Sequence, residues 1–196
     1  MLTIGITGGI GSGKTTVARV IETLGYPVYF SDPAAARLVN EDAAVRTALV
    51  DRFGRETYSP AGRLDKERLA ALIFNDPLAL ADANAIIHPA VARDFRAWRV
   101  GRDEALLFLE SAILFESCLA DEFDAVILVS AGLDTRVERV MQRDGVSRDK
   151  VLARVHNQPA IDEARADFII RNNPGDMLVE QVLDIINTLT NTRQWQ

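Results

Sequence analysis

Cysteine and histidine are scarce in this chain of 196 residues, which holds one cysteine and two histidines. Cys118 cannot form an internal disulfide, and His88 and His156 are too few to assemble a Cys/His metal cluster. The sequence therefore excludes a disulfide scaffold and a structural zinc site. Because sparse cysteine suits a reducing compartment, we expect a cytoplasmic protein.

Long apolar stretches are also missing. The runs Ala105–Leu109 and Ala125–Val129 fall far short of the ~18 residues that a membrane-spanning helix requires. The N-terminus has no charged segment ahead of an apolar one, as a signal peptide would. We therefore expect neither a membrane span nor a signal peptide.

An excess of positive charge is absent as well, because the formal net charge is -6 at pH 7. Non-specific nucleic-acid binding needs a basic surface that displaces counterions, so we expect no nucleic-acid partner. With 48% hydrophobic and 26% charged residues, the composition is that of a soluble globular protein. The length suits one domain, with room for an inserted subdomain.

Short apolar runs alternate with amphipathic segments along the chain. The predicted strands are 2–6, 28–30, 106–109, 125–129 and 168–170. Helical patterns cover about 14–24, 134–144, 147–157 and 177–189. A helical block over 33–102 has breaks at Gly54, 59–62 and Asp76-Pro77, and we expect a helix to begin near Pro89. Strands that alternate with helices predict an α/β fold with a parallel sheet.

A glycine-rich loop joins the first strand to the first helix. Gly8-Gly9-Ile10-Gly11-Ser12-Gly13-Lys14-Thr15 matches the Walker A pattern in the strand-to-helix context that this pattern requires. Backbone N–H groups of Gly11, Ser12, Gly13 and Thr16 would bind phosphate at the helix N-terminus. Lys14 would reach the β/γ-phosphates of ATP, and the Thr15 hydroxyl would hold Mg²⁺. The alternative is a glycine-rich turn that binds no ligand.

The loop alone does not distinguish kinases from GTPase switches. A GTPase should carry an Asn-Lys-x-Asp motif, and none of the three lysines stands in one. Asp51-Arg52-Phe53-Gly54 spells Asp-x-x-Gly but follows a helical pattern, so we interpret it as a helix end. The long helical block suits an acceptor-binding subdomain better than a switch.

Two acidic residues follow predicted strands, at the edge where parallel sheets bind ligands. Asp32 could orient an acceptor hydroxyl and take its proton; alternatively, Ser31 or Asp32 caps the helix that starts near Pro33. Glu110 could bind Mg²⁺ through water, or it could be a cap. Sequence alone leaves both pairs of alternatives open.

Three arginines and a histidine complete the candidate residues. Arg136, Arg139 and Arg143 are spaced three and four residues apart and so share one helix face. They form either a solvated face or a lid that neutralises the γ-phosphate. His88 is either a structural residue or a ligand-binding one.

Together these residues resemble the dephospho-CoA kinases, which perform the last step of coenzyme A synthesis. The matching segments, in chain order, are Ile6–Thr16, Leu24–Val28 with Asp32, His88-Pro89, Ile113–Glu116, Arg139, Arg143–Gly145, Arg154, Gln158, Ala166-Asp167 and Asn172-Asn173. Only the phosphate loop is specific by itself, but the order and spacing of the segments are specific together.

The resemblance implies a P-loop NTPase fold similar to that of nucleoside monophosphate kinases. Its five-stranded parallel core would comprise 1–32, 103–133 and 159–196, with a helical CoA subdomain at 33–102 and a small lid at 134–158. It implies that Asp32 and His88 bind the substrate and that Asn173 lies beside the nucleotide base. Arg139 and Arg143 would close from the lid.

Two positions depart from the family pattern. Phe30 stands where the family often has the first aspartate of Asp-x-Asp, and Ala112 stands where proline commonly precedes Leu-Leu-Phe-Glu. We expect Asp32 to suffice, because one carboxylate within hydrogen-bond reach of the hydroxyl is enough for proton transfer.

The resemblance therefore implies transfer of the ATP γ-phosphoryl group to the ribose 3′-hydroxyl of dephospho-CoA. The predicted catalytic residues are Lys14, Asp32, Arg139 and Arg143, in an enzyme that acts on small molecules as a monomer or small homo-oligomer. A kinase for another small alcohol and an ATP-binding regulatory module remain alternatives. The intact Asp32 and the lid arginines count against the regulatory module.

Overall fold

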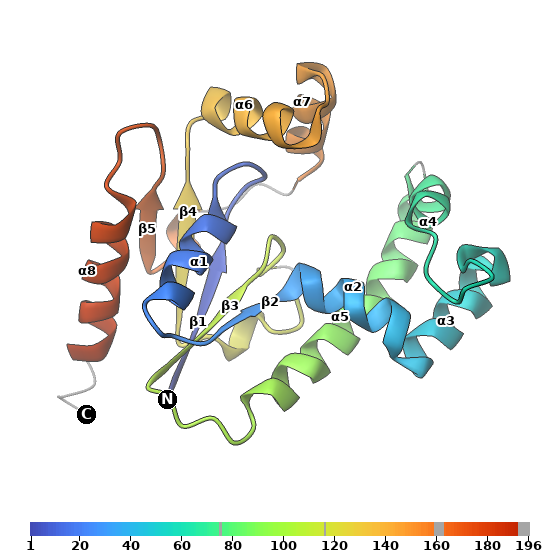
Figure 1. Ribbon diagram of the computed structural model, residues 1–196, viewed down its shortest axis with the longest axis horizontal. Coiled ribbons are helices and arrows are strands. Elements are labelled where there is room, and N and C mark those ends of the chain that lie inside the picture. The colour runs from blue at the N-terminus through green and yellow to red at the C-terminus, as the bar shows by residue number, and fades with distance from the viewer. Residues whose placement is uncertain (75, 116, 159–162, 192–196) are drawn as a thin grey trace. The chain divides into compact units, whose positions relative to one another are not determined.

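The computed structural model describes residues 1–74, 76–115, 117–158 and 163–191. The chain divides into two compact units, one made of Met1–Tyr29 with Arg102–Gln196 and the other of Phe30–Gly101. We term them the phosphate-loop unit and the helical unit, and each is described by itself (Figure 1).

The phosphate-loop unit is built on a five-stranded sheet with the strand order β2-β3-β1-β4-β5. The strands are β1 (Leu2–Thr7), β2 (Val28–Phe30), β3 (Leu106–Glu110), β4 (Ala125–Ser130) and β5 (Phe168–Arg171). β1 pairs in parallel with both β3 and β4, and β4 pairs in parallel with β5. The five predicted strands and the α/β class are confirmed.

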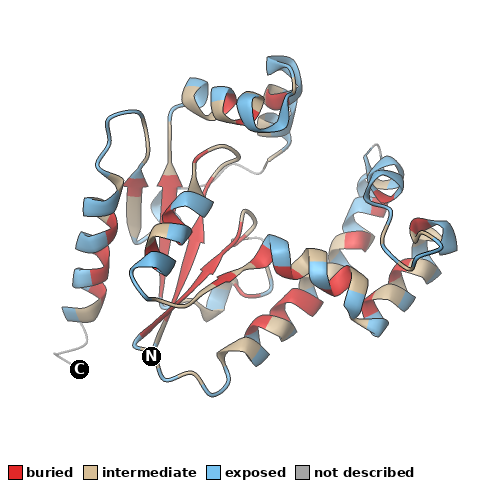
Figure 2. Cartoon of the chain, in the orientation of Figure 1, coloured by how far each residue is buried: buried red, intermediate tan, exposed pale blue. Residues whose placement is uncertain are grey.

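Helices cover the sheet and bury its strands (Figure 2). The side chains of Leu106–Leu109 in β3 are at most 1% exposed. α1 (Lys14–Thr23) and α8 (Leu178–Asn191) contact each other and turn their apolar faces inward. Parallel strands that are covered on both faces appear in the sequence as continuous apolar runs, which is why the sequence revealed them.

Two short helices of the same unit make up most of the segment expected to be a lid, and we refer to them as the lid. α6 (Leu133–Asp144) ends at Gly145, whose φ of 65° is left-handed, and α7 (Arg148–Asn157) follows. Val137, Val140 and Val151 form the core between them, and Ile10 of the glycine-rich loop packs against this core. The lid is therefore in contact with the loop.

The helical unit contains α2 (Ser31–Glu41), α3 (Ala43–Phe53), η1 (Arg55–Thr57), α4 (Lys66–Ile73) and α5 (Pro77–Arg99). Asp42, Asp65 and Asp76 cap α3, α4 and α5 by accepting hydrogen bonds from first-turn amides. The predicted breaks are confirmed. Gly54, with a φ of 90°, follows the end of α3, so Asp51–Gly54 is a helix end as expected.

One local expectation was wrong, and one of the open alternatives is not what the structure shows. No helix begins near Pro89, because α5 runs through this residue. A proline inside a helix removes one N–H donor and crowds the carbonyl four residues before it, yet the helix continues, with alanines of high helix propensity at Ala90 and Ala92 on its C-terminal side. Neither Ser31 nor Asp32 caps α2: its N-cap is Phe30, and both residues lie in the first turn. None of the described helices is long and apolar enough to cross a membrane.

Candidate active site

The glycine-rich loop leaves β1 at Thr7 and enters α1 at Lys14. Gly11 and Gly13 have φ angles of 77° and 91°, a region that side chains rarely adopt. A Cβ on Gly11 would collide with the backbone carbonyl of Arg136, and a Cβ on Gly13 would collide with the Asn172 amide. The loop can therefore take this path only with glycine at these positions.

The N-terminus of α1 is open to an anion. Its N-cap is Gly13, which has no side chain that could bond to the first-turn amides of Lys14, Thr15 and Thr16. Such amides and the positive end of the helix dipole attract phosphate. Thr15 and Thr16 are exposed, so a ligand can reach this end of the helix.

Glu110 lies beside the start of the same helix. It ends β3 in register with Ile6 of β1 and is 2% exposed. Its Oε1 atom is 3.7 Å from Lys14 Nζ and accepts a hydrogen bond of 3.5 Å from the Thr15 hydroxyl. The structure thus brings a buried carboxylate, a cation and a hydroxyl together.

The carbonyl oxygen of Ser12 is held from two directions. Asn172 Nδ2 donates to it over 2.8 Å from the loop after β5, and Arg139 donates over 3.4 Å from α6. The Ser12 hydroxyl is buried and has no hydrogen-bond partner within the described parts of the chain. A buried hydroxyl without a partner is suited to a polar ligand.

Asn173, the predicted neighbour of the nucleotide base, fixes the loop that follows β5. Its side-chain oxygen accepts from the Gly132 amide over 2.8 Å, just before α6. Its side-chain nitrogen and backbone N–H donate to Asp176 over 3.1 and 2.6 Å. Asn173 therefore links the loop after β5 to the start of the lid, while its neighbour Asn172 reaches the glycine-rich loop.

The lid arginines divide into two groups. Arg136 donates to the Ile10 carbonyl over 2.9 Å, and Arg139 contacts Ser12, so both face the loop. Arg143 instead pairs with Asp144 at 2.7 Å, and Arg154 pairs with the same carboxylate at 2.7 Å. Hydrogen bonding from Arg143 is the largest cause that holds the pKa of Asp144 below its usual value. A uniformly solvated arginine face is therefore wrong for Arg136 and Arg139.

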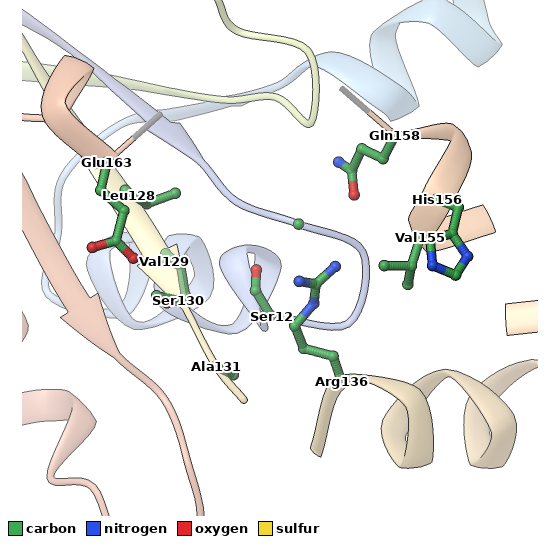
Figure 3. A pocket seen from close by; sticks show the side chains of 11 residues that line it. Ser12, Leu128, Val129, Ser130, Ala131, Arg136, Val155, His156, Gln158 and Glu163 are labelled. Carbon is green, nitrogen blue, oxygen red and sulfur yellow. The ribbon is translucent and has the colours of Figure 1, made fainter. Parts of the chain in front are cut away.

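A cavity of about 390 Å³ lies between the loop, the carboxyl end of β4 and the lid (Figure 3). Its apolar residues include Leu128, Val129 and Val155, and its polar lining comes from Ser12, Ser130, Arg136, His156, Gln158 and Glu163. The mixture of donors, acceptors and apolar surface is typical of a small-molecule site.

Asp32 and His88 belong to the helical unit. Asp32 is exposed in the first turn of α2, and His88 is half-buried within α5. Burial lowers the pKa of His88 below its usual value, because the cationic imidazole loses hydration. Glu116, the last residue of the Ile113–Glu116 match, lies outside the described residues.

Sequence reasoning did not single out Asn172 or the loop contact of Arg136. Asn172 stands in the matched Asn172-Asn173 pair, so a signal for it existed. Arg136 shares the spacing of the lid arginines but lies outside the segments that resemble the family. Only the folded chain distinguishes it from Arg143.

Comparison with known proteins gives one consistent family. The family model for dephospho-CoA kinase matches residues 2–177. The dephospho-CoA kinase of Porphyromonas gingivalis is 44% identical over 196 residues, covering 98% of this chain and 96% of that protein. The dephospho-CoA kinase of Bacteroides fragilis is 40% identical over 186 residues, covering 93% and 90%.

Solved structures agree in fold. TT1252 from Thermus thermophilus superposes with a TM-score of 0.83 at 37% identity, covering 95% of this chain and 96% of that one. The dephospho-CoA kinase of Campylobacter jejuni gives a TM-score of 0.70 at 23% identity, covering 97% and 98%. A shikimate kinase from Acinetobacter baumannii shares the general fold. It gives a TM-score of 0.53 at 16% identity and covers 98% of this chain and 94% of that one.

Proposed function

This chain belongs to the dephospho-CoA kinase family, and we propose that the site around its phosphate loop is where the γ-phosphoryl group of ATP is transferred to dephospho-CoA. The reaction phosphorylates the ribose 3′-hydroxyl and gives coenzyme A, the last step of its synthesis. The observation that carries the site assignment is the N-terminus of α1, which follows Gly11 and Gly13 and has no side-chain cap.

Lys14 and the loop amides bind the phosphates of ATP. The amides of Gly11, Ser12 and Gly13, with those of the first turn of α1 up to Thr16, form a cradle for the β-phosphate. The ammonium group of Lys14 compensates the charge that develops between the β- and γ-phosphates. The contact between Lys14 and Glu110 supports this role, because it holds the lysine at the start of α1.

The residues present also fit Mg²⁺. Thr15 offers a hydroxyl, and Glu110 offers a buried carboxylate oxygen within 3.5 Å of it; Mg²⁺ prefers such oxygen donors. Thr15 would hold the ion directly and Glu110 through water. When bound, Mg²⁺ neutralises charge on the β- and γ-phosphates.

Asp32 is the proposed general base. The 3′-oxygen of dephospho-CoA forms a bond to the γ-phosphorus, the bond from that phosphorus to the β,γ-bridging oxygen breaks, and ADP leaves. The hydroxyl proton passes to the Asp32 carboxylate. The exposure of Asp32 in the first turn of α2 supports this role, because a substrate can reach it.

The remaining residues orient the two substrates. Arg139 and Arg143 close from the lid and neutralise the transferring phosphoryl group. Asn173 lies beside the nucleotide base, and His88 contacts dephospho-CoA. The contact of Arg139 with Ser12 supports the first of these roles.

We further propose one P-loop kinase domain with its core at 1–32, 103–133 and 159–196, a CoA-binding subdomain at 33–102 and a lid at 134–158. The enzyme is cytoplasmic, acts on small molecules without a nucleic-acid or membrane partner, and is a monomer or small homo-oligomer. The low cysteine content and the negative net charge support this description.

A coupled assay of ADP release tests the function. ADP should form with ATP, Mg²⁺ and dephospho-CoA together, and omission of dephospho-CoA should abolish its formation. ADP release with another small alcohol but not with dephospho-CoA would indicate a different kinase. Nucleotide binding without turnover would indicate a regulatory module.

A further inference from the structure

Ile10 lies in the phosphate loop, and both of its backbone polar groups bond to lid side chains. Its N–H donates to Gln158 Oε1 over 2.8 Å, and its carbonyl accepts from Arg136 Nε over 2.9 Å. Its side chain packs against the lid core of Val137, Val140 and Val151. The lid thus holds Ile10 by three separate contacts.

Arg136 is fitted closely against the loop. A Cβ on Gly9 would lie 2.6 Å from one guanidinium nitrogen of Arg136 and 2.7 Å from its central carbon, so the guanidinium rests on the bare backbone of Gly9. Gly9 occupies a variable position of the Walker A pattern, which does not itself require glycine there. A side chain at position 9 would therefore require the end of the Arg136 side chain to move from its place against the loop.

The charge of Arg136 has no acidic partner within the described residues. Its one hydrogen bond there is to the neutral Ile10 carbonyl, and burial lowers its pKa below the usual value. An arginine kept half-buried without a carboxylate costs desolvation energy. Arg148, on the outer surface of the same lid, instead pairs with Asp134 at 2.6 Å.

We propose that Arg136 and Gln158 are positioning residues that keep the phosphate loop in its nucleotide-binding shape by holding Ile10 from both sides. In Figure 3 both side chains point from the lid toward the loop. The inference rests on the proposed function, because it assumes that the loop binds the β-phosphate. It gives the lid a role in the ground state, separate from the closing of Arg139 and Arg143 on the transferring group.

Calorimetric titration of ATP and ADP into the full chain tests this role. Arg136→Met keeps the side-chain stem but removes the donor and the charge, and it should raise the Kd of both nucleotides about tenfold, as expected for a lost charged hydrogen bond. The factor should be equal for ATP and ADP, because both carry the β-phosphate. A loss confined to ATP would mean direct contact with the γ-phosphate and would overturn the proposal.

Matched variants separate positioning from charge. Arg148→Met should leave both Kd values unchanged, and an equal loss in Arg136→Met and Arg148→Met would contradict the proposal. Arg136→Lys retains the charge without Nε, so it should bind nearly as weakly as Arg136→Met; full recovery would show that charge alone matters. If Arg136→Met does not fold, Arg136→Lys against Arg148→Lys provides the same comparison.

The double variant Arg136→Met/Gln158→Leu tests whether Arg136 and Gln158 both act through Ile10. Gln158→Leu removes the acceptor for the Ile10 N–H and should also weaken ATP and ADP binding. Because both side chains hold Ile10, the combined loss in Arg136→Met/Gln158→Leu should be smaller than the product of the two single losses. A full product would show independent roles. These titrations need no dephospho-CoA, so a failure of the proposed acceptor would leave their result unaffected.

Discussion

At the scale of single residues, two side chains at the start of α1, one cationic and one hydroxyl, contact the same buried carboxylate. Lys14 and Thr15 both contact Glu110 Oε1. A buried ion pair of this kind fixes the lysine at the end of the helix where phosphate is expected. The proposed roles of Lys14, Glu110 and Asp32 lead to three predictions.

Lys14→Ala should remove most turnover while leaving the fold intact, because the lysine compensates charge between the β- and γ-phosphates. Steady-state kinetics measure the loss, and circular dichroism should be unchanged. Lys66→Ala, at an exposed position in α4, is the matched control and should retain full activity. A near-normal kcat for Lys14→Ala would mean that the loop is not a catalytic phosphate site.

Glu110→Gln should raise the Mg²⁺ concentration needed for half-maximal activity by about tenfold, the lower end of the effect of losing a metal-site partner. The substitution keeps the shape of the side chain and removes its charge. Glu180→Gln, exposed at the start of α8, is the control. An unchanged Mg²⁺ titration would leave Glu110 as a structural partner of Lys14 only.

Asp32→Asn should lower kcat by about 10²-fold or more, as for the loss of a general base, with ATP binding nearly unchanged. Phe30→Asp restores the first family aspartate and should change the rate by no more than a few-fold, or impair folding, because Phe30 is half-buried. Rapid-quench and titration experiments separate these effects. Full activity of Asp32→Asn would assign the proton to another carboxylate, such as Glu110 or Glu116.

At the scale of elements, α6 presents its arginines to different partners. Arg136 and Arg139 contact the phosphate loop, whereas the Arg143 side chain is 63% exposed and pairs with Asp144. An arginine that must leave an exposed ion pair to reach the phosphate contributes little to ground-state binding. Its proposed contribution therefore belongs to the closed lid.

Arg143→Ala should lower kcat by about 10²-fold, the scale of one lost transition-state charge contact, and should change KM for ATP much less. Initial-rate kinetics at varied ATP concentration measure both constants. Arg148→Ala removes another exposed, paired lid arginine and should have no effect. If only KM rises, Arg143 binds the ground state; if neither constant changes, it has no role in the reaction.

The elements themselves were the most predictable part of the structure. Each strand was predicted to within two residues, because apolar runs and flanking turn residues are local signals. The continuous helix through Pro89 was not predicted. Proline is also a local signal, and here it wrongly indicated the start of a new helix. Packing of buried residues on both sides, including Ala83 and Phe95, accompanies the continuous helix.

At the scale of the whole molecule, the chain has two compact units, and the proposed ATP site lies in the phosphate-loop unit. A ligand that binds only the folded state stabilises it in proportion to the logarithm of its concentration. Nucleotide should therefore stabilise this unit independently of dephospho-CoA.

ADP at about 100 times its Kd should stabilise the protein by about 2.7 kcal/mol and raise the Tm by roughly 5–10 °C. Differential scanning calorimetry measures the shift. Adenosine, which lacks phosphates, should produce a much smaller one, and Lys14→Ala should reduce the response to ADP. A wild-type Tm that ADP does not change would contradict nucleotide binding at the loop.

The sequence by itself determined the phosphate loop, the strands that surround it and the helical block, because each depends on residues that are near neighbours in the chain. The glycines, Lys14 and Thr15 were recognisable from spacing alone. The resemblance to the family then depended on the order of such short segments.

Tertiary structure alone decided which distant side chains meet the loop. Glu110 reaches Thr15 from 95 positions away, and Asn172 reaches Ser12 from 160 positions away. Equal spacing on one helix could not distinguish Arg136, which bonds to Ile10, from Arg143, which bonds to Asp144. Helical periodicity gives the face on which a side chain lies, but only the packing of the lid against the loop determines its partner.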